Sequence, residues 1–372
     1  MRAVGIILAG GNNQKMRELS NKRAIAAMPV AGSFRSIDFA LSSMTNSGIQ
    51  KVAVLTQYNS RSLNEHLSSS KWWDFGRKQG GLFVFTPTIT AGNNFWFRGT
   101  ADALAQNLDF LKRCHEPYVV IASGDGVYKL DYSKVLEYHI DKKADITVVC
   151  TDVPEGDDVS RFGVVKMDDD GRIESFEEKP IDAVGNLISA GIYVIRRRQL
   201  IELIEKAASE DRFDFVKDIL VRYKNMKRIY AYKMDSYWAN ISTVDAYYKT
   251  NMDFLKPEVR DYFFRQYPDV YSRIEDMPPA KYNPGADVRN SLVSAGCIVN
   301  GKVENSILFK KVFVGENCVI KNSIILNDVY IGDNTYIENC IVESHDTIRA
   351  NSRHVGEGEV KIVVETNERY VM

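Results

Sequence analysis

Two short segments carry the residue types that phosphate and metal chemistry require. Gly10 and Gly11 directly follow an apolar run at residues 4–8, whose lack of helical periodicity predicts a buried parallel strand. Glycines at such a turn let backbone N–H groups approach a phosphate closely, although a plain tight turn is the alternative. Asp125 follows a second apolar run, at 118–122. A carboxylate there could hold Mg²⁺ for phosphoryl or nucleotidyl transfer, or it could cap the next helix.

The elements that would position these residues alternate between strands and helices. Further strands are predicted at 51–55, 81–85 and 146–150, and helices near 62–67, 101–112 and 132–139. This alternation predicts an α/β domain with a mostly parallel sheet. Because such sheets bind ligands beyond the carboxyl ends of their strands, we expect Gly10–Gly11, Thr56–Tyr58 and Ser123–Asp125 to lie close together.

The pattern of the chain changes after Gly285. The segments Val314-Gly-Glu-Asn-Cys-Val-Ile320 and Ile331-Gly-Asp-Asn-Thr-Tyr-Ile337 are near copies that begin 17 residues apart, and within each copy an aliphatic residue recurs after six positions. This is a hexapeptide repeat, in which three short strands make one coil and the aliphatic side chains point into a triangular β-helix.

Length and composition limit the class of protein. The 372 residues suggest more than one domain, and we expect an α/β domain at 1–254, a linker at 255–285 with a short helix near 259–267, and a β-helix at 286–372. A formal net charge of −1 gives no reason to expect a nucleic-acid partner, and no apolar run is long enough to span a membrane. Five scattered cysteines and a start without a signal-peptide pattern favour the cytoplasm.

Several blocks, in order along the chain, resemble the glucose-1-phosphate adenylyltransferase (ADP-glucose pyrophosphorylase) family, which makes ADP-glucose and pyrophosphate from ATP and glucose 1-phosphate for bacterial glycogen synthesis. The blocks are Leu8-Ala-Gly-Gly11, Arg23-Ala24, Met28-Pro29, Phe34–Phe39, Thr56-Gln-Tyr58, Phe95–Ala103, Ser123–Lys129, Arg161–Val165, Phe176–Pro180, Ile188–Tyr193, Asp214–Asp218 and Ser236–Ala246. The resemblance implies a Rossmann-like nucleotidyltransferase domain of the GT-A-like kind, followed by a left-handed parallel β-helix.

The resemblance also implies roles for individual residues. Catalytic positions would be Lys15 and Asp125, with Asp125 on the metal. Nucleotide-binding residues would be Leu8, Ala9, Gly10, Gly11, Gln57, Gly99 and Thr100, and sugar-phosphate-binding residues would be Gly163, Glu178, Lys179 and Ser189. The amide of Gln57 would pair with an adenine edge, the alternative being a loop glutamine bonded to backbone. Asp102 would either lie near the nucleotide or act as a charge at a helix N-terminus. Arg35 would bind an anionic effector, or else pair with Asp38 or a backbone carbonyl.

This chain departs from the family pattern at several positions, some of which carry chemistry in active members. Asn13 replaces a loop glycine, Lys15 an arginine, Ile25 a lysine, Gly126 a histidine, Val216 a glycine, Asn240 an aspartate and Ser242 a glycine. The aspartate missing at Asn240 would be the second carboxylate on Mg²⁺, and an amide brings no negative charge. Because nucleotidyl transfer depends on metal and basic charges around the transferring phosphate, we expect an inactive or nearly inactive site that binds Mg²⁺ weakly or not at all.

These departures point to the D-type companion subunit of glycogen synthesis, a regulatory partner of a catalytic subunit in a hetero- or homotetramer. ATP, ADP-glucose, glucose 1-phosphate or an anionic effector remain candidate ligands. The alternative is a low-activity pyrophosphorylase in its own right. Two other readings stay open: a scaffold that binds no small molecule, and a hexapeptide acyltransferase that would use His345 or His354 as its base.

Overall fold

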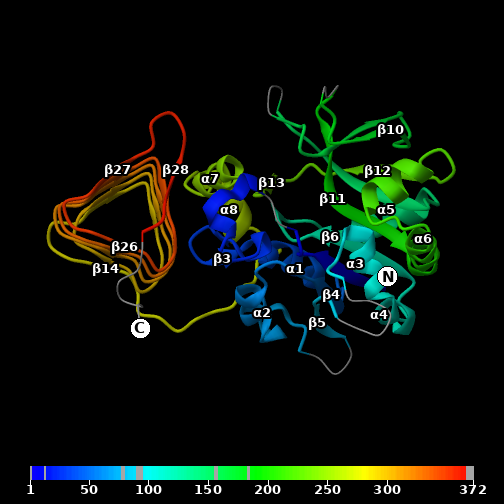
Figure 1. The fold of residues 1–372 in the computed structure, drawn as a ribbon, viewed down its shortest axis with the longest axis horizontal. Coiled ribbons are helices and arrows are strands. Elements are labelled where there is room, and N and C mark those ends of the chain that lie inside the picture. The colour runs from blue at the N-terminus through cyan, green and yellow to red at the C-terminus, as the bar shows by residue number, and fades with distance from the viewer. Residues whose placement is uncertain are drawn as a thin grey trace. The chain divides into compact units, whose positions relative to one another are not determined.

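The computed structural model describes residues 2–11, 14–76, 80–88, 95–154, 158–181 and 185–365. The chain divides into two compact units (Figure 1). The first unit contains residues Met1–Gly11, Phe39–Ser60 and Leu67–Trp238, and the second contains Asn12–Asp38, Arg61–His66 and Ala239–Met372. These units differ from the ranges predicted from the sequence, because two N-terminal segments group with the C-terminal part of the chain.

The first unit is built on one large sheet. Its main path runs β10-β9-β11-β6-β1-β4-β5, with β8 also paired to β11, and β12 paired to β8. The strands are β1 (Ala3–Leu8), β4 (Lys51–Leu55), β5 (Gly81–Phe85), β6 (Tyr118–Ser123), β8 (Ile146–Asp152), β9 (Gly163–Met167), β10 (Ile173–Glu178), β11 (Leu187–Arg196) and β12 (Ile229–Lys233), and the short strands β7 (Gly126–Tyr128) and β13 (Trp238–Asn240) lie outside it.

The sheet is more mixed than the mostly parallel sheet that the sequence predicted. Strands β5, β4, β1 and β6 are parallel, as are β12 and β8, but β11 runs antiparallel to β6, β8 and β9. Strand β10 is also antiparallel to β9, and this reversal follows from a short connection without a helix, which suffices to join antiparallel strands.

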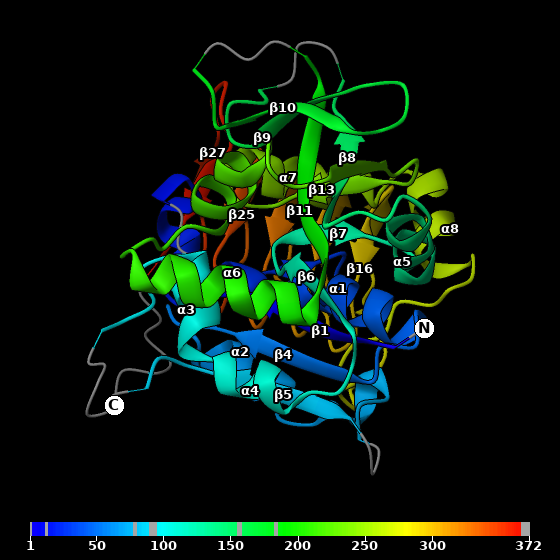
Figure 2. The same ribbon diagram turned by 90° about the vertical axis from the view of Figure 1, so that its right-hand side faces the viewer.

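The helices of the first unit are α1 (Ser36–Asn46, which begins in the second unit), α3 (Thr100–Gln106), α4 (Leu108–Arg113), α5 (Tyr132–Asp141) and α6 (Arg197–Ser209), with shorter turns η3 (Ser70–Trp73) and η4 (Val216–Val221). The predicted helix at 101–112 is therefore two helices, which meet at Asn107. Helix α6 crosses one face of the sheet (Figure 2), and its Leu200 and Ile204 join the core made by the central strands. Strand β1 pairs in parallel with β4 and β6 and is buried on both faces, as is usual where crossover helices cover both sides of a parallel sheet, and this burial explains its continuous apolar run.

The second unit contains a parallel β-helix with three flat sides (Figure 1). Its strands are β14 (Lys281–Tyr282), β15 (Asp287–Arg289), β16 (Leu292–Val293), β17 (Ile298–Val299), β18 (Lys302–Glu304), β19 (Ile307–Leu308), β20 (Phe313–Val314), β21 (Val319–Lys321), β22 (Ile324–Ile325), β23 (Tyr330–Ile331), β24 (Tyr336–Glu338), β25 (Cys340–Val342), β26 (Thr347–Ile348), β27 (Arg353–Val355) and β28 (Lys361–Val363). The repeat predicted from the sequence is confirmed, and the coils begin already at Lys281. Val314, Ile331 and Ile348 stack in register inside it.

Asparagines at the corners allow the coils to turn. Asn317, Asn334 and Asn351 have positive φ angles, a conformation that asparagine tolerates better than most residues. Their side-chain amides also hydrogen-bond from coil to coil, Asn317 to Asn334 and Asn334 to Asn351, each at 3.2 Å. The corner asparagines thus satisfy the backbone geometry of the turn and connect neighbouring coils.

The N-terminal segment of the second unit carries η1 (Gln14–Ser20), η2 (Ile25–Ala27), β2 (Pro29–Val30) and β3 (Phe34–Arg35); α2 (Arg61–Leu67), which ends in the first unit, α7 (Val244–Asp253) and α8 (Pro257–Phe264) complete it. Arg23 forms a buried ion pair with Glu343 of the β-helix and donates to Ser344 Oγ at 3.2 Å. Asn251 of α7 accepts a hydrogen bond from Ala31 N at 3.0 Å. These bonds fix the segment to both the β-helix and α7.

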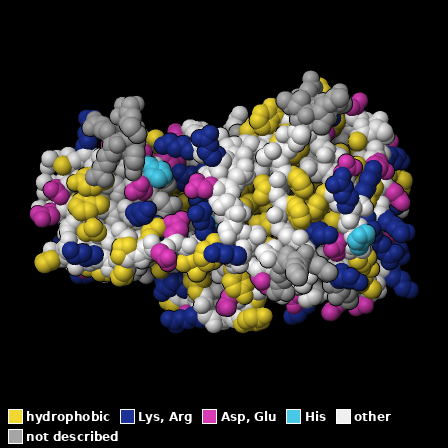
Figure 3. All heavy atoms as spheres, turned by 90° about the horizontal axis from the view of Figure 1, so that it is seen from below, with side chains coloured by type: hydrophobic (Ala, Val, Ile, Leu, Met, Phe, Trp, Pro, Cys, Tyr) yellow, Lys and Arg dark blue, Asp and Glu magenta, His cyan; other side chains and the backbone are white. Residues whose placement is uncertain are grey.

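The surface and the helices agree with the composition. On the face shown in Figure 3, basic and acidic side chains are interspersed, as expected from a net charge near zero. Among the helices of the described residues, none has the length and apolarity that crossing a membrane demands.

The buried pair of Arg23 and Glu343 gives a stability prediction. Arg23→Met leaves the Glu343 carboxylate buried without its partner, so we expect the free energy of unfolding to fall by about 3–5 kcal/mol. Adding Glu343→Gln removes the stranded charge and should recover most of the loss. Urea unfolding of both variants measures this.

Lys321→Met provides the matched control, because Lys321 forms an exposed pair with Glu304 at 3.9 Å. It should cost at most about 1 kcal/mol. An Arg23→Met variant as stable as the Lys321→Met variant would contradict a structural role for the buried pair.

Candidate functional site

A cavity of about 420 Å³ opens in the first unit beside the carboxyl ends of β1, β4 and β6. We call it the sheet-edge cavity. It is lined by Leu8, Gly10, Gly11, Leu55, Gln57, Tyr58, Phe97, Arg98, Gly99, Thr100, Ala103, Ser123, Gly191, Tyr193, Phe215 and Val216. Of the residues predicted to bind nucleotide, only Ala9 is not among these; its N–H donates to Leu55 O at 2.8 Å. The loops after the three strands meet as the sequence predicted.

The two glycines after β1 leave their backbone open. A Cβ added at Gly11 would meet nothing within 4 Å among the described atoms, and one at Gly10 would make only ordinary contacts with Gln57. Packing within this unit therefore does not require glycine at either position. A ligand that approaches the backbone closely, such as a phosphate, would require it.

Gln57 makes the backbone bonds that the sequence left open as the alternative to an adenine contact. Its amide nitrogen donates to Phe97 O at 3.2 Å, and its amide oxygen accepts from Phe97 N at 2.7 Å. Both functional atoms of the amide are therefore engaged by backbone, and an adenine edge would have to displace one of them. Gln57 still lines the cavity, so contact with a nucleotide stays a prediction.

A second pair of segments closes the wall of the cavity. A Cβ at Gly99 would lie 2.4 Å from Phe213 O, so only glycine fits there. Phe213 O accepts from Ala101 N at 2.7 Å and Asp102 N at 3.2 Å, and Thr100 Oγ1 accepts from Phe215 N at 2.9 Å. These bonds join residues 99–102 to residues 213–215.

Asp102 takes the structural role of the two considered. Its carboxylate accepts from Arg98 N at 2.9 Å, lies 3.1 Å from Arg98 Nη2, and accepts from Gln106 at 3.0 Å. The Arg98 guanidinium in turn lies 3.8 Å from the centre of the Phe213 ring. Asp102 thereby holds the start of α3 and the Arg98 side chain in place.

Residues predicted to bind the sugar phosphate lie next to the sheet-edge cavity. Ser189 Oγ is 3.4 Å from the hydroxyl of Tyr193, which lines the cavity, and Glu178 is paired with Gly163 across β10 and β9. Burial raises the pKa of Glu178, and the neighbouring Lys179 opposes this effect with an amine at 3.3 Å. Lys179 is otherwise exposed. The predicted residues thus supply a carboxylate (Glu178), a hydroxyl (Ser189) and a long cationic side chain (Lys179) to one region.

The positions that the sequence predicted to be catalytic, or to have lost a catalytic residue, are engaged in local structure. Asp125 accepts a hydrogen bond from Ser123 Oγ at 2.5 Å. Asn240, in the second unit, accepts from Ser242 N at 2.9 Å and from the Ser242 hydroxyl through its side-chain oxygen. Ile25 is 6% exposed and lies in η2, whereas Lys15 is exposed in η1. Asn13 lies outside the described residues. Within the ranges that the structure describes, no group of three histidine, cysteine or acidic side chains could hold a metal.

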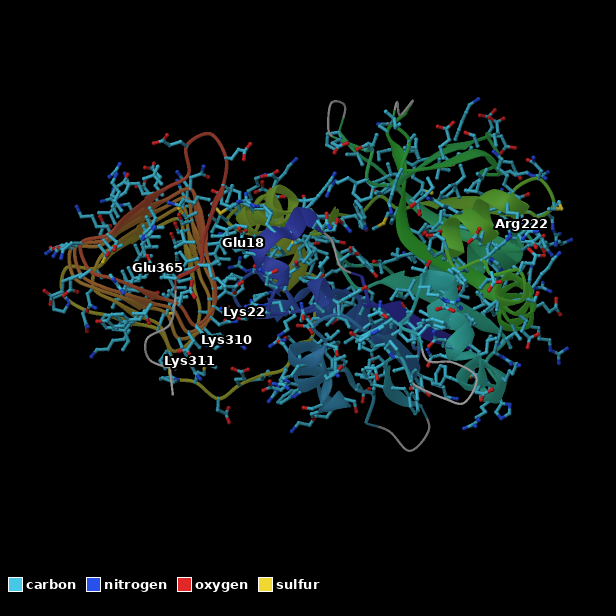
Figure 4. All side chains as sticks on the ribbon, viewed as in Figure 1. Glu18, Lys22, Arg222, Lys310, Lys311 and Glu365 are labelled. Carbon is cyan, nitrogen blue, oxygen red and sulfur yellow. The ribbon has the colours of Figure 1, made fainter. Side chains whose placement is uncertain are left out.

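A second cavity, of about 360 Å³, lies in the second unit and is rich in basic groups. We call it the basic pocket. Its charged residues are Arg35, Arg273, Lys310 and Lys311, with Glu65, Glu275 and Asp328 as acidic members and His66 and His345 as histidines. Figure 4 shows Lys310 and Lys311 on the β-helix. Three segments far apart in sequence therefore supply cations to one pocket.

Contacts within the basic pocket orient its cations. The Arg35 Nη1 atom donates to Ser62 O and Ser62 Oγ, both at 2.8 Å, and Arg35 N donates to Asp38 at 2.8 Å. These are the structural bonds foreseen as the alternative for Arg35. Burial lowers the pKa of Lys310; Glu275, whose carboxylate is 3.7 Å away, raises it, and Arg35 lowers it again. An anion in the pocket would relieve this unfavourable environment.

Comparison with known proteins places the two parts of the chain. A family model described as nucleotidyl transferase matches residues 4–257, and one described as GlmU-like, C-terminal hexapeptide matches residues 278–361. A glucose-1-phosphate adenylyltransferase of Pseudothermotoga lettingae is 38% identical over 322 residues, covering 86% of this chain and 76% of the relative. The enzyme of Clostridium acetobutylicum is 39% identical (85% and 84% covered), and that of Geobacillus stearothermophilus is 37% identical (86% and 83%).

The chain belongs to the glucose-1-phosphate adenylyltransferase family. The α/β nucleotidyltransferase fold followed by a left-handed hexapeptide β-helix is thereby confirmed. Members of this family named for their activity transfer an adenylyl group to glucose 1-phosphate, and the sheet-edge cavity lies at the switch in strand order where α/β sheets bind ligands.

Reasoning from the sequence missed most of the basic pocket. Arg273 comes from the segment predicted to be a linker, and Lys310 and Lys311 lie at a turn of the β-helix, where Lys311 has φ of 60°. In the sequence, the signal for this pocket was the pair of adjacent lysines at a corner of the repeat. The sequence also gave no reason to place Val216 on the wall of the sheet-edge cavity.

The contact between Gln57 and Phe97 gives a prediction that requires no ligand. Gln57→Ala removes both bonds to the Phe97 backbone, so amide hydrogen exchange at Phe97 should accelerate by roughly five- to tenfold, the effect of one net hydrogen bond. Gln57→Glu keeps an acceptor for Phe97 N and should accelerate exchange less. Equal exchange in all three proteins would show that the pair does not hold this segment.

Proposed function

We propose that this chain is a non-catalytic or weakly active regulatory subunit of glucose-1-phosphate adenylyltransferase, of the D type, which assembles with a catalytic subunit in bacterial glycogen synthesis. The observation that carries the proposal is the engagement of Asn240 by Ser242. At the position where the resemblance requires a metal carboxylate, the chain has a neutral amide whose oxygen already accepts two hydrogen bonds. Ile25, buried and apolar, removes a second charge.

Magnesium does not fit the residues present. In the active family the ion would neutralise charge on the reacting phosphates. Here Asp125 is the one carboxylate at the predicted metal positions, and it accepts a bond from Ser123. The neutral amide of Asn240 stands in place of the second predicted carboxylate, and this loss of charge supports a site that binds Mg²⁺ weakly or not at all.

The basic pocket supports the regulatory part of the proposal. Its four Arg and Lys side chains outnumber its three carboxylates, and the Nη1 atom of Arg35, bonded to Ser62 O and Oγ, fixes the guanidinium in the pocket. A phosphate or sugar phosphate offers acceptors for this fork and for Lys310. Arg35 would then contribute to an effector site in addition to its structural bonds.

The remaining features fit a subunit with ligand-binding ability and little chemistry. The sheet-edge cavity is retained, so ATP, ADP-glucose or glucose 1-phosphate remain candidate ligands, and a low-activity pyrophosphorylase is the second candidate function. A hexapeptide acyltransferase with His345 or His354 as its base is a weaker alternative. His345 lies 3.1 Å from Asp328, and His354 lies 3.3 Å from Glu365 with a pKa lowered by burial, so both imidazoles already have acidic neighbours. We propose a cytoplasmic tetramer in which the β-helix contributes subunit contacts.

The isolated chain should make negligible ADP-glucose. The variant carrying Asn240→Asp, Ile25→Lys and Lys15→Arg together should be more active than any single substitution, because such groups act as a unit. A radiometric or coupled assay of ADP-glucose formation measures this, with the chain alone and mixed with a catalytic subunit. Turnover by the unaltered chain in the ordinary enzyme range, about 1–10³ s⁻¹, would establish the second candidate function instead.

The basic pocket predicts stabilisation by anions. Phosphate should raise the thermal midpoint of unfolding of the chain. The folded state should gain about 2.7 kcal/mol of stability when the free phosphate concentration is 100 times its dissociation constant. Lys310→Met should reduce this increase, whereas Lys302→Met, on a solvated face of the same β-helix, should leave it unchanged. Equal phosphate responses in both variants would remove the basic pocket from the regulatory proposal.

A further inference from the structure

The sheet of the first unit ends on one side at strand β5. This strand pairs with β4 along one edge, and no strand of the described residues pairs with its other edge. Figure 2 shows β5 beyond β4 at the lower side of the sheet. Its residues are Gly81-Leu-Phe-Val-Phe85, none of them charged, and the Phe83 side chain is 38% exposed. Such an edge presents a row of unpaired N–H and C=O groups to another extended chain.

The other outer strands of this sheet are protected against such pairing. Strand β10, at the opposite end, carries the exposed Glu174 and Glu177, and Glu174 pairs with Lys166 of β9 at 3.0 Å. Charged side chains are one means by which proteins prevent edge strands from pairing. Strand β12 is covered by a turn, since Ala231 N donates to Gly171 O at 2.8 Å. Strand β5 has no charges and, among the described residues, no such cover.

The bonds that join β5 to β4 show which backbone groups of β5 point outward. Gly81 N donates to the backbone just before β4, and Phe85 O accepts from the backbone just after it, each at 2.9 Å. Backbone groups of successive residues alternate between the two edges of a strand. Every second residue from Gly81 therefore faces β4, and the N–H and C=O groups of Leu82 and Val84 face outward.

We propose that the β5 edge binds the same edge of a second copy of this chain, antiparallel and about a two-fold axis at Phe83. This register pairs all five residues of β5 with their counterparts. Leu82 lies opposite Val84 of the copy, and because the backbone groups of both point outward, the two residues exchange hydrogen bonds. Phe83 lies opposite Phe83 of the copy in a non-hydrogen-bonded pair, where side chains approach most closely.

The side chains of β5 are complementary to themselves in this register. Gly81 comes opposite Phe85 of the copy, so the residue without a side chain faces a large ring. The Phe83 ring, whose centre lies 5.4 Å from that of Phe110 in α4, gains a second aromatic neighbour. An uncharged strand offers no charge that would select a different chain, whereas an identical strand satisfies both rows of backbone groups at once. The two-fold arrangement uses the same surface on both copies.

This interface is separate from the β-helix contacts proposed above and does not depend on whether the chain is catalytic. A tetramer of dihedral symmetry requires more than one kind of two-fold interface, and β5 supplies one from the first unit. Five residues are far fewer than the roughly 20–30 a side of a standard interface. The contact should therefore depend on protein concentration.

Cysteine cross-linking of the full chain tests the register. Residues opposite each other in a non-hydrogen-bonded pair have Cα atoms about 4.5 Å apart, a distance that a disulfide spans. Phe83→Cys should therefore form a disulfide-linked dimer on oxidation. Leu82→Cys is the matched control, because it lies two residues from its counterpart along the strand, beyond the roughly 7 Å limit for a disulfide. The five native cysteines are buried, so the unaltered chain should give no such dimer.

Sedimentation velocity over a range of protein concentrations tests the association itself. Phe83→Lys places like charges opposite each other and should raise the concentration at which half the chains associate by at least about tenfold. Met226→Lys adds the same charge at an apolar residue that is 68% exposed and lies outside β5, and it should leave association unchanged. Thermal unfolding checks that both variants fold.

Equal cross-linking of Phe83→Cys and Leu82→Cys would overturn the proposed register and with it the interface. Association that Phe83→Lys does not weaken, or that Met226→Lys weakens equally, would also overturn the proposal. If Phe83→Lys removes only the binding of a catalytic subunit, the β5 edge pairs with that partner and not with a second copy. Should Phe83→Lys not fold, the two cysteine variants decide alone.

Discussion

The close approach of Gly99 to the carbonyl oxygen of Phe213 is the constraint on which the sheet-edge cavity depends. No side chain fits between them, and at this close approach the segments at 99–102 and 213–215 join through backbone hydrogen bonds to Phe213 O and through the bond from Phe215 N to Thr100 Oγ1. Gln57 then fixes the other side of the first segment through Phe97. Loops that follow different elements thereby become one wall, and the strands of the sheet only have to deliver the glycine loop to its edge.

The second unit depends on a different principle, the stacking of identical coils. Each coil supplies aliphatic side chains to a shared interior and asparagines to its corners, so the backbone is fixed by the repeat, and the outward residues are free to specialise. Glu343 and Ser344 of the outward set receive Arg23, and Lys310 and Lys311 complete the basic pocket. One regular scaffold therefore serves both stability and charge placement.

The sheet-edge cavity of the first unit and the basic pocket of the second unit bear on different parts of the proposed function. The sheet-edge cavity lies at the edge of the sheet of the first unit, and two residues that the sequence placed at catalytic positions have local partners: Asn240 bonds to Ser242, and Ile25 packs in a buried turn. The basic groups are concentrated instead where the β-helix and the N-terminal segment of the same unit meet. Under the regulatory function that we propose, the chain would bind ligands and respond to anions, since binding needs a shaped cavity and transfer additionally needs charges around the reacting phosphates.

The sequence alone determined the strand after which Gly10 and Gly11 turn, the alternation of strands and helices, and the β-helix, because each depends on local pattern: an apolar run, a glycine turn or a repeat of six. It also identified Asn240 and Ile25 as departures in chemistry. Only the tertiary structure decided that Gln57 binds the Phe97 backbone and that Val216 lines the cavity. It alone also decided that β11 runs antiparallel to β6 and that residues 12–38 group with the β-helix. Those facts depend on which distant segments meet, and side-chain partners more than 30 residues apart leave no periodic signal in one sequence.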